Sequence, residues 1–188
     1  MTLNEAIKLI KGDLHRYGQS GIVGGGISYF LIPGFKYTLF LRLAQWTASS
    51  KVLVLLKYAV MFKLLLMQRH YGIQIPAGTK IGKGFYIGHF GCIVVNPDAV
   101  IGDNVNISQG VTIGQTNRGP RKGTPRIGNN VYIGPGAKII GNIAIGNDAA
   151  IGANAVVTHD VPDNAVVAGV PAKIISMTGS RGYVNNKI

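Results

Sequence analysis

The sequence predicts a mainly β fold, in which a triangular parallel β-helix follows an α-helical amino-terminal region. Isoleucine or valine recurs every six residues from Ile75 to Val157, with one slip and one gap. Glycine reaches 27 of 188 residues without the triplet period of collagen, which indicates many enforced turns. The first 70 residues lack the six-residue period and carry helical signals instead.

The amino-terminal region is expected to form helices in order along the chain. Thr2 and Glu5 have the spacing of a capping box, which places the start of the first helix. The run Gly21–Gly26 is expected to break the helical pattern after it, because glycine has a low helix propensity. The three expected segments are residues 2–17, a stretch from Pro33-Gly34-Phe35 to about Ser49, and Lys51–His70.

The third helical segment is apolar but interrupted by lysines. On a helix of 100° per residue, Lys51, Lys57 and Lys63 point in three directions, so no clean polar face results. Its longest uncharged run is five residues, whereas a membrane-spanning helix needs about 20 apolar residues. Two explanations remain open: the helix lies at a membrane surface with its lysines reaching toward water, or it packs against helices of an oligomer.

The six-residue period predicts the coil. We interpret each repeat as a short parallel strand that sends one aliphatic side chain inward, with Gly, Asn or Asp at the corners. The period predicts between four and five turns, stacked about 4.8 Å apart, with a two-residue slip within Ile93–Val95. A β-sandwich with coincidental spacing is the alternative, and thirteen positions on one period disfavour it. The thirteen are Ile75, Ile81, Ile87, Val95, Ile101, Ile107, Ile113, Ile127, Ile133, Ile139, Ile145, Ile151 and Val157.

One segment, residues 115–126 (Q-T-N-R-G-P-R-K-G-T-P-R), interrupts the period. It is polar, basic and rich in turn-forming residues, so we expect it to project from the coil as a loop. Projecting loops often build binding sites, although a tolerated surface insertion has the same composition.

The formal charge of +12 favours an anionic partner. Residues 1–70 contribute +7 of it, with nine Lys or Arg against Glu5 and Asp13. Lipid headgroups, phosphates and acidic glycans are the candidate partners. Nucleic acid is disfavoured because no recognition helix, paired RNA-stacking aromatics or zinc-ligand spacing accompanies the charge.

Three motifs carry a family resemblance: Y-I-G-H-F-G-C-I-V-V around His89, V-N-I-S-Q-G-V-T-I-G after it, and V-V-A-G-V-P-A-K-I-I near the end. The chain resembles bacterial serine acetyltransferases and the O-acetyltransferases of capsule and exopolysaccharide clusters. The resemblance covers about residues 70–175, and a weaker similarity is present upstream at D-L-H-R-Y and P-G-F. It implies a left-handed β-helix, acetyl-CoA as donor, and a homotrimer with active sites between adjacent coils.

The resemblance and the period together predict the organisation of the chain. A basic, apolar helical region is expected at residues 1–70, a β-helix domain at 71–175 with its loop at 115–126, and a tail at 176–188. The single cysteine, Cys92, excludes an internal disulfide framework and fits a reducing cytosol.

The resemblance implies that His89 is the catalytic general base. The family's orienting aspartate corresponds to Gln74 here, and the aspartate of its Asp-His pair corresponds to Gly88. The family's loop arginine and second histidine are also missing, which leaves Arg126 as the acceptor-side cation of the loop. These departures lie on the acceptor side of the expected site, and we interpret them as evidence against serine as acceptor.

An alcohol attacks a thioester only if its proton is removed, and a neutral imidazole suits that task near neutral pH. No serine with a local base is present, so we expect direct transfer in a ternary complex rather than an acyl-enzyme. His159, in a turn-like T-H-D-V-P segment, is expected to be exposed, and His15 and His70 receive no role. The resemblance implies donor contacts at Gly114, Gln115, Thr116, Gly134, Pro135, Gly136, Gly152, Ala153 and Lys173, with Lys138 as a weaker candidate.

The sequence therefore predicts acetylation of a sugar hydroxyl in a capsular, exopolysaccharide or lipid-linked glycan precursor, in the cytoplasm at the inner face of the membrane. The alternatives are serine O-acetylation for cysteine biosynthesis and a non-catalytic scaffold. A zinc hydratase of the γ-carbonic anhydrase type needs three histidines, and the coil has only His89 and His159, so no metal is expected.

Overall fold

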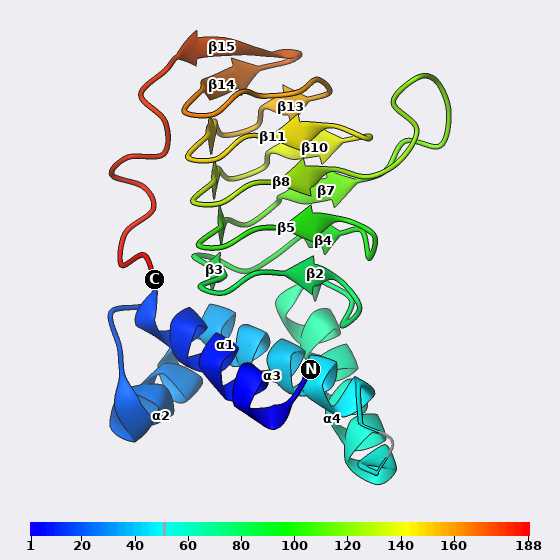
Figure 1. The fold of residues 1–188 in the computed structure, drawn as a ribbon, viewed down its shortest axis with the longest axis vertical. Coiled ribbons are helices and arrows are strands. Elements are labelled where there is room, and N and C mark those ends of the chain that lie inside the picture. Colours follow the sequence, from blue (N-terminus) through cyan, green and yellow to red (C-terminus); the bar gives the residue numbers. More distant parts are fainter. Residues whose placement is uncertain (51) are drawn as a thin grey trace.

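A computed structural model describes residues 1–50 and 52–188 and consists of a helical base beneath an upright coil (Figure 1). The base holds α1 (Leu3–His15), α2 (Gly21–Leu31), α3 (Pro33–Ala48) and α4 (Val54–Tyr71). Lys51, where the third helical segment was expected to begin, lies outside the described residues. Within the described part of the chain, no helix is long and apolar enough to cross a membrane.

The first helix begins with the predicted capping box. The Glu5 amide donates to Thr2 Oγ1 at 3.2 Å, and the Thr2 amide donates to Glu5 Oε2 at 2.7 Å. Both bonds satisfy N–H groups that a helix start leaves without intrahelical partners.

The expected break at Gly21–Gly26 is wrong, because α2 begins at Gly21 and includes this run. The chain breaks earlier, at the turn where Gly18 has a φ of 70°. The low helix propensity of the glycines is overridden by packing: a Cβ on Gly24 would lie 3.2 Å from Gln19 Oε1, so the helix backbone lies close to the preceding turn.

Helix α3 joins the base to the coil through two buried polar side chains. The Tyr37 hydroxyl donates to Ile75 O at 3.0 Å and accepts from the Ile75 amide at 3.2 Å. The Arg42 guanidinium binds both carboxylate oxygens of Asp13, at 2.9 and 3.2 Å, and donates to the first turn of the coil at Ile81 O, 2.9 Å away. Arg42 and Asp13 are both fully buried, so the three elements meet at one ion pair.

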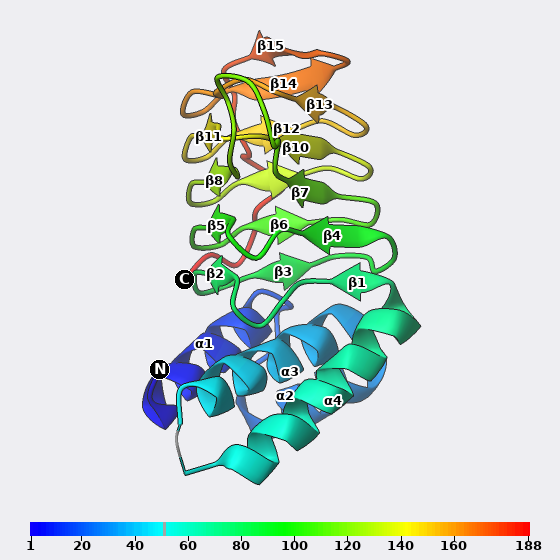
Figure 2. The ribbon, with the colours of Figure 1, turned by 90° about the vertical axis from the view of Figure 1, so that its right-hand side faces the viewer.

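The coil has three faces of short parallel strands, as Figures 1 and 2 show. The first face contains β1 (Ile73–Gln74), β4 (Ile93–Val95), β7 (Thr112–Gly114), β10 (Lys138–Ile140) and β13 (Val156–Val157). The second contains β2 (Lys80–Ile81), β5 (Val100–Ile101), β8 (Arg126–Ile127) and β11 (Ala144–Ile145). The third contains β3 (Tyr86–Ile87), β6 (Asn106–Ile107), β9 (Tyr132–Ile133), β12 (Ala150–Ile151), β14 (Val166–Gly169) and the antiparallel β15 (Ala172–Ser176).

The predicted β-helix is confirmed, since all thirteen periodic positions are buried and strands pair in register from turn to turn, as in Ile87↔Ile107 and Ile107↔Ile133. The predicted slip falls in β4, where Ile93 and Val95 point inward and Val94 outward. The coil reaches the upper end of the predicted four to five turns, because a bridge at Val161 and the strand at Val167 complete the fifth.

Two segments leave the coil. The loop between β7 and β8 projects sideways and is closed at its base by paired hydrogen bonds between Thr116 and Gly123, at 3.0 and 3.1 Å (Figure 1). After β15 the tail returns along the coil to the helical base, where Ile188 exchanges hydrogen bonds with Asn104 at 3.1 and 3.2 Å. The tail therefore ties the last turns of the coil to the first.

Candidate active site

His89 lies at the corner between β3 and β4, where the third face meets the first. The corners above it stack directly: the Gly110 amide donates to Gly91 O at 2.8 Å, the Gly136 amide to Gln109 O at 2.9 Å, and the Asn154 amide to Pro135 O at 2.8 Å. We call this column of corners, residues 88–92, 108–111, 134–137 and 152–155, the His89 edge. It forms a continuous ridge along the height of the coil.

The His89 side chain is exposed, in a turn whose backbone is constrained. Gly91 and Cys92 have φ angles of 108° and 53°, so the turn uses the left-handed region twice in succession. Phe90 is half-exposed and packs edge-on against Tyr71, with ring centroids 5.5 Å apart. Tyr71 ends α4, so the helical base supports the turn that presents the imidazole.

The two residues predicted on the acceptor side make no hydrogen bond to His89 in the part of the chain that the structure describes. Gln74 lies on the first face in β1, paired with Val94, and among the described residues its exposed amide makes no hydrogen bond to His89. Arg126 lies in β8 on the second face, paired with Val100. Within one chain Arg126 is therefore on a different side of the coil from His89.

The predicted donor contacts divide into two groups. Gly134, Pro135, Gly136, Gly152 and Ala153 belong to the His89 edge, directly above the imidazole. The others lie elsewhere: Gly114, Gln115 and Thr116 at the far corner of the first face, where the loop departs, and Lys173 in β15, paired with Ala168 at the top of the coil.

Lys138, the weaker candidate for a phosphate contact, is engaged within the coil. Its Nζ donates a hydrogen bond to Gly110 O, in the corner beneath it. This bond holds the lysine side chain against the His89 edge, where it reaches from the rung of Gly136 down to the rung of Gly110.

A cavity of about 500 Å³, which sequence reasoning missed, lies beside Gly88. Arg16 and Tyr17 from the end of α1 form one wall, Tyr86 and Asn106 of the third face another, and Tyr183 of the tail a third. Burial raises the pKa of Tyr17 and lowers that of Arg16, because water is excluded from both groups.

Arg16 is the cation of this cavity. It donates to Gly84 O at 2.7 Å, Asn106 Oδ1 at 2.6 Å and Asn185 O at 2.9 Å. These three bonds leave two of the five N–H groups of the guanidinium unused. The only sequence signal was the D-L-H-R-Y motif, because the tail has neither a period nor a recognised motif.

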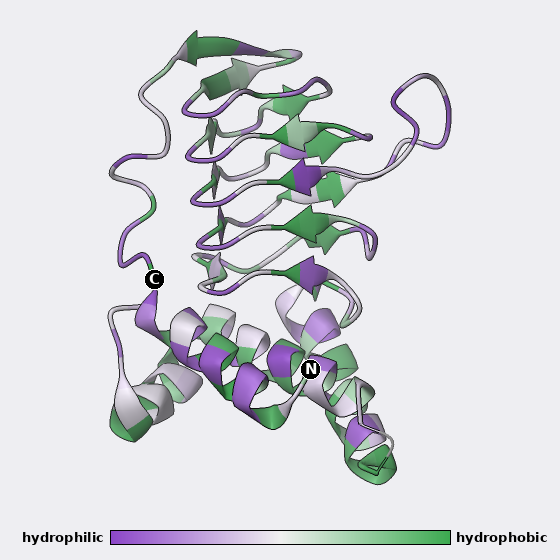
Figure 3. Cartoon of the chain, in the orientation of Figure 1, coloured by the Kyte–Doolittle hydropathy of each residue, from purple (hydrophilic) through white to green (hydrophobic). Residues whose placement is uncertain are grey.

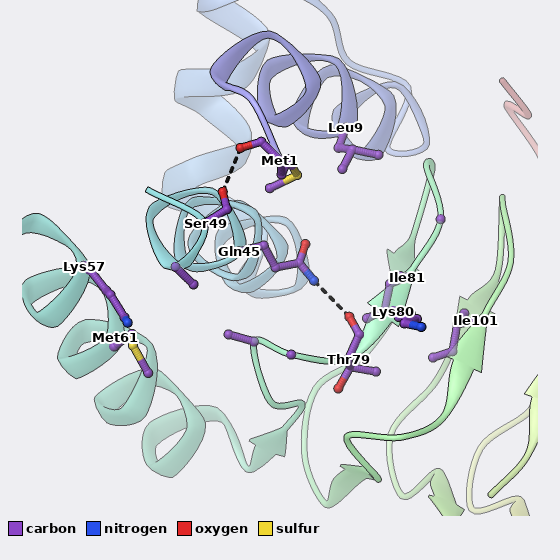
Figure 4. Close-up of a pocket in the computed structure, with 14 residues that line it drawn as sticks. Met1, Leu9, Gln45, Ser49, Lys57, Met61, Thr79, Lys80, Ile81 and Ile101 are labelled. Atoms are coloured by element: carbon purple, nitrogen blue, oxygen red, sulfur yellow. Dashed lines mark hydrogen bonds between the residues drawn. The ribbon is translucent and has the colours of Figure 1, made fainter. Parts of the chain in front are cut away.

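A larger cavity, about 770 Å³, lies elsewhere, between the helical base and the second face (Figure 4). Its walls are mainly apolar, and Gln45 spans one side by donating to Thr79 O at 3.0 Å. No histidine or carboxylate lines it, so it offers no general base. Across the residues that the structure describes, no three His, Cys, Asp or Glu side chains are grouped to hold a metal ion.

Comparisons with known proteins agree with the fold of the coil. The model of the bacterial transferase hexapeptide family (six repeats) matches residues 124–159. A solved serine acetyltransferase from Brucella abortus, in complex with coenzyme A, is 32% identical and superposes with a TM-score of 0.78 over 94% of this chain and 70% of its own. The chain belongs to the hexapeptide-repeat transferases. The left-handed β-helix that the resemblance implied is thereby confirmed.

Curated relatives of this hexapeptide-repeat transferase are also serine acetyltransferases. The protein from Synechococcus elongatus is 37% identical over 149 residues, 79% of this chain and 59% of its own length. That from Staphylococcus aureus is 46% identical over 110 residues, 58% of this chain and 52% of its own. The chain thus spans between half and three-fifths of the length of these relatives.

The prediction that this transferase acetylates a sugar hydroxyl is wrong. These relatives and solved structures, including one from Vibrio cholerae with a TM-score of 0.77 over 92% of this chain, are serine acetyltransferases. The prediction was based on family residues replaced at Gln74 and missing from the loop, and on the basic charge of loop 115–126 and of the apolar amino-terminal region. It did not consider residues outside the family motifs, such as Arg16, which lines the cavity beside Gly88.

Proposed function

We propose that the chain is an acetyl-CoA-dependent serine O-acetyltransferase that works as a homotrimer, with His89 as general base. The observation that carries the proposal is the exposed His89 imidazole at the foot of a stacked edge, in a chain whose solved relatives are serine acetyltransferases. One of those relatives was solved with coenzyme A. A cytoplasmic location belongs to the proposal, because acetyl-CoA must be supplied.

The donor is proposed to lie along the His89 edge. Small residues at its corners leave room for a narrow pantetheine arm, and four rungs of roughly 4.8 Å each separate His89 from the hairpin at Gly169. Lys173, exposed beside that hairpin, supplies a cation for a CoA phosphate. Gly114, Gln115 and Thr116 face the donor from a neighbouring coil in this arrangement.

The chemistry requires one proton to move twice. Neutral His89 takes the proton of the serine hydroxyl while its oxygen attacks the thioester carbonyl carbon. When the carbon–sulfur bond breaks, the imidazolium returns the proton to the departing thiolate. An acceptor on the second ring nitrogen would hold the productive tautomer. Gln74, one rung below on the first face, is the proposed source of that acceptor.

The acceptor is proposed to enter through the cavity beside Gly88. Serine carries a carboxylate, and an arginine with unused N–H groups in a partly dry cavity is a suitable partner for it. Arg16 meets that description, with 5% of its surface exposed and two N–H groups unused. Arg126 of an adjacent subunit is a second proposed cation, since it needs another coil to approach His89.

An assay of thiol release from acetyl-CoA tests the activity. We expect L-serine to stimulate release and L-alanine, which lacks the hydroxyl, to leave it at background. Replacing His89 by alanine is expected to lower kcat by about 10²–10⁴-fold, the usual contribution of a general base. His159→Ala is the matched control, because that histidine is exposed and bonds only the neighbouring Thr158. Equal activity in both variants, or no stimulation by serine, would contradict the proposal.

The trimer is tested separately by light scattering after gel filtration. A mass near three times 19.9 kDa is expected, and a monomer would remove the proposed shared site.

A further inference from the structure

Helix α2 turns an apolar face to solvent. Ile22 is 95% exposed and Phe30 80%, although both are large hydrophobic residues. Val23, Ile27 and Leu31 are exposed on the same helix, while Gly24 and Ser28 face the protein. Isolated exposed hydrophobic residues are ordinary, but a contiguous set of this kind indicates a contact surface.

Helix α4 also turns large hydrophobic residues to solvent. Its buried stripe consists of Val60, Leu64 and Met67 only. At 100° per residue, Leu55, Tyr58 and Phe62 point away from that stripe. Leu55 is 87% exposed and Phe62 62%. The apolar residues of this helix therefore form an outward face as well as the buried stripe.

The charge around these two helices is of one sign. From Leu14 to Pro97 the sequence contains no aspartate or glutamate but nine lysines and arginines. Lys57 and Lys63 lie on the two flanks of the α4 stripe, at the sides of its apolar face. An apolar face bordered by cations only is the arrangement of helices that lie on anionic membranes.

The position of the two faces fits a flat partner. Helices α2 and α4 lie at the end of the molecule away from the coil, and the hydropathy colouring shows apolar residues at the tips of both (Figure 3). The coil rises from the opposite side of the base (Figure 1). A large surface that covered α2 and α4 would leave the coil in water.

We propose that the exposed apolar residues of α2 and α4, here called the base surface, dock the protein on an anionic lipid bilayer. A second copy of the chain is a poorer occupant, because it would set Lys57 and Lys63 against an equally basic surface without acids to neutralise them. Lipid headgroups carry the complementary charge, and the acyl region receives the apolar side chains. This inference goes beyond the proposed activity and does not depend on it.

Co-sedimentation with lipid vesicles tests the base surface. At low salt, the full-length protein is expected to pellet with vesicles of phosphatidylcholine and phosphatidylglycerol, and much less with phosphatidylcholine alone. Phe30→Ser with Phe62→Ser is expected to weaken binding by about tenfold or more per phenylalanine, because each ring leaves the acyl region. Lys57→Gln with Lys63→Gln is expected to remove most of the salt dependence.

The matched control removes apolar surface at the opposite end of the molecule. Ile174 and Ile175 in β15 are 53% and 65% exposed, so Ile174→Ser with Ile175→Ser should bind vesicles like the unmodified protein. All altered positions are exposed or half-buried, and circular dichroism checks that each variant folds. A protein that stays in solution with the anionic vesicles, or equal loss in the control, overturns the proposal. If Phe30→Ser with Phe62→Ser splits a lipid-free assembly instead, the base surface joins copies of the chain and the proposal is wrong.

Discussion

The coil and the helical base place their hydrophobic residues in opposite ways: the coil buries them and the base leaves many of them exposed. In the coil, one aliphatic side chain per strand points inward and all thirteen periodic positions are buried. In the base, α4 buries only Val60, Leu64 and Met67 while Leu55 and Phe62 face solvent. A repeated unit buries its hydrophobic residue against identical units of its own chain. The helices have no such partners, so their remaining apolar surface indicates a contact outside the chain.

The two regions are joined by a shared hydrophobic core and by buried polar contacts. Arg42 connects α3 to Asp13 of α1 and to the carbonyls of the first turn of the coil. The tail makes a second connection, because Asn185 O accepts from Arg16 of the base and Tyr183 O accepts from Asn106 of the third face. Changes at the junction and on either side of it therefore test how far the coil and the base are one folding unit.

The largest effect on stability is expected at the junction. Arg42→Leu leaves the carboxylate of Asp13 buried without a cation, which is expected to cost about 3–5 kcal/mol in the free energy of unfolding. Urea denaturation followed by circular dichroism measures the loss. Asp13→Asn combined with Arg42→Leu is expected to recover part of it, because no unpaired charge remains. A loss below about 1 kcal/mol would show that the ion pair does not join the two regions.

A second prediction concerns how the stability of Arg42→Leu depends on pH. Burial raises the pKa of Asp13, and the Arg42 guanidinium opposes that rise. Without Arg42 the folded-state pKa lies further above the unfolded value, so folding favours the protonated acid. The stability lost in Arg42→Leu is therefore expected to return as the pH falls toward the unfolded pKa of about 3.9, and to be lost again as pH rises. A loss that is constant with pH would contradict this cause.

A pair of truncations compares the two regions directly. Ile139→Ala empties a fully buried position in the coil and is expected to cost about 2–5 kcal/mol. Leu55→Ala removes a side chain that is 87% exposed and is expected to change stability by about 0.5 kcal/mol or less without lipid. Chemical denaturation of both variants gives the comparison. Similar losses at the two positions would mean that Leu55 is already covered, as in an oligomer.

The coil was predictable because its signal is repeated. A single Ile-Gly pair does not predict a fold. Thirteen positions on one period predict the strand order, the register and the inward side chains. Helix α2 was not predictable, since glycine propensity argued against it and only the packing of Gly24 explains it. The fifth turn was predicted only as far as Val157, because Val161 follows after four residues rather than six.

The site was predicted only where a local motif carries it. His89 and the corners above it follow from the period and the family motif, and the structure places them on one edge. The cavity beside Gly88 combines α1, the third face and the tail, which lie far apart in sequence. No local pattern signals that Arg16 meets Asn185 after 169 residues of separation. The substrate prediction counted the missing family residues, and no sequence pattern showed that Arg16 would line a cavity beside Gly88.

A smaller effect than at Arg42 or Ile139 is expected from the tail, the second connection between the coil and the base. Tyr183 stacks on Tyr132, with ring centroids 4.4 Å apart, while its backbone carbonyl accepts from Asn106 Nδ2 at 2.9 Å. Tyr183→Ala keeps the carbonyl and removes the ring, so about 0.5–1.5 kcal/mol is expected to be lost. Tyr183→Phe is the matched control and should retain the stacking. Because Tyr183 also lines the cavity beside Gly88, the alanine variant is expected to raise KM for serine without changing that for acetyl-CoA. Equal changes in the KM for serine and the KM for acetyl-CoA would show that the tail supports the coil as a whole rather than the cavity beside Gly88.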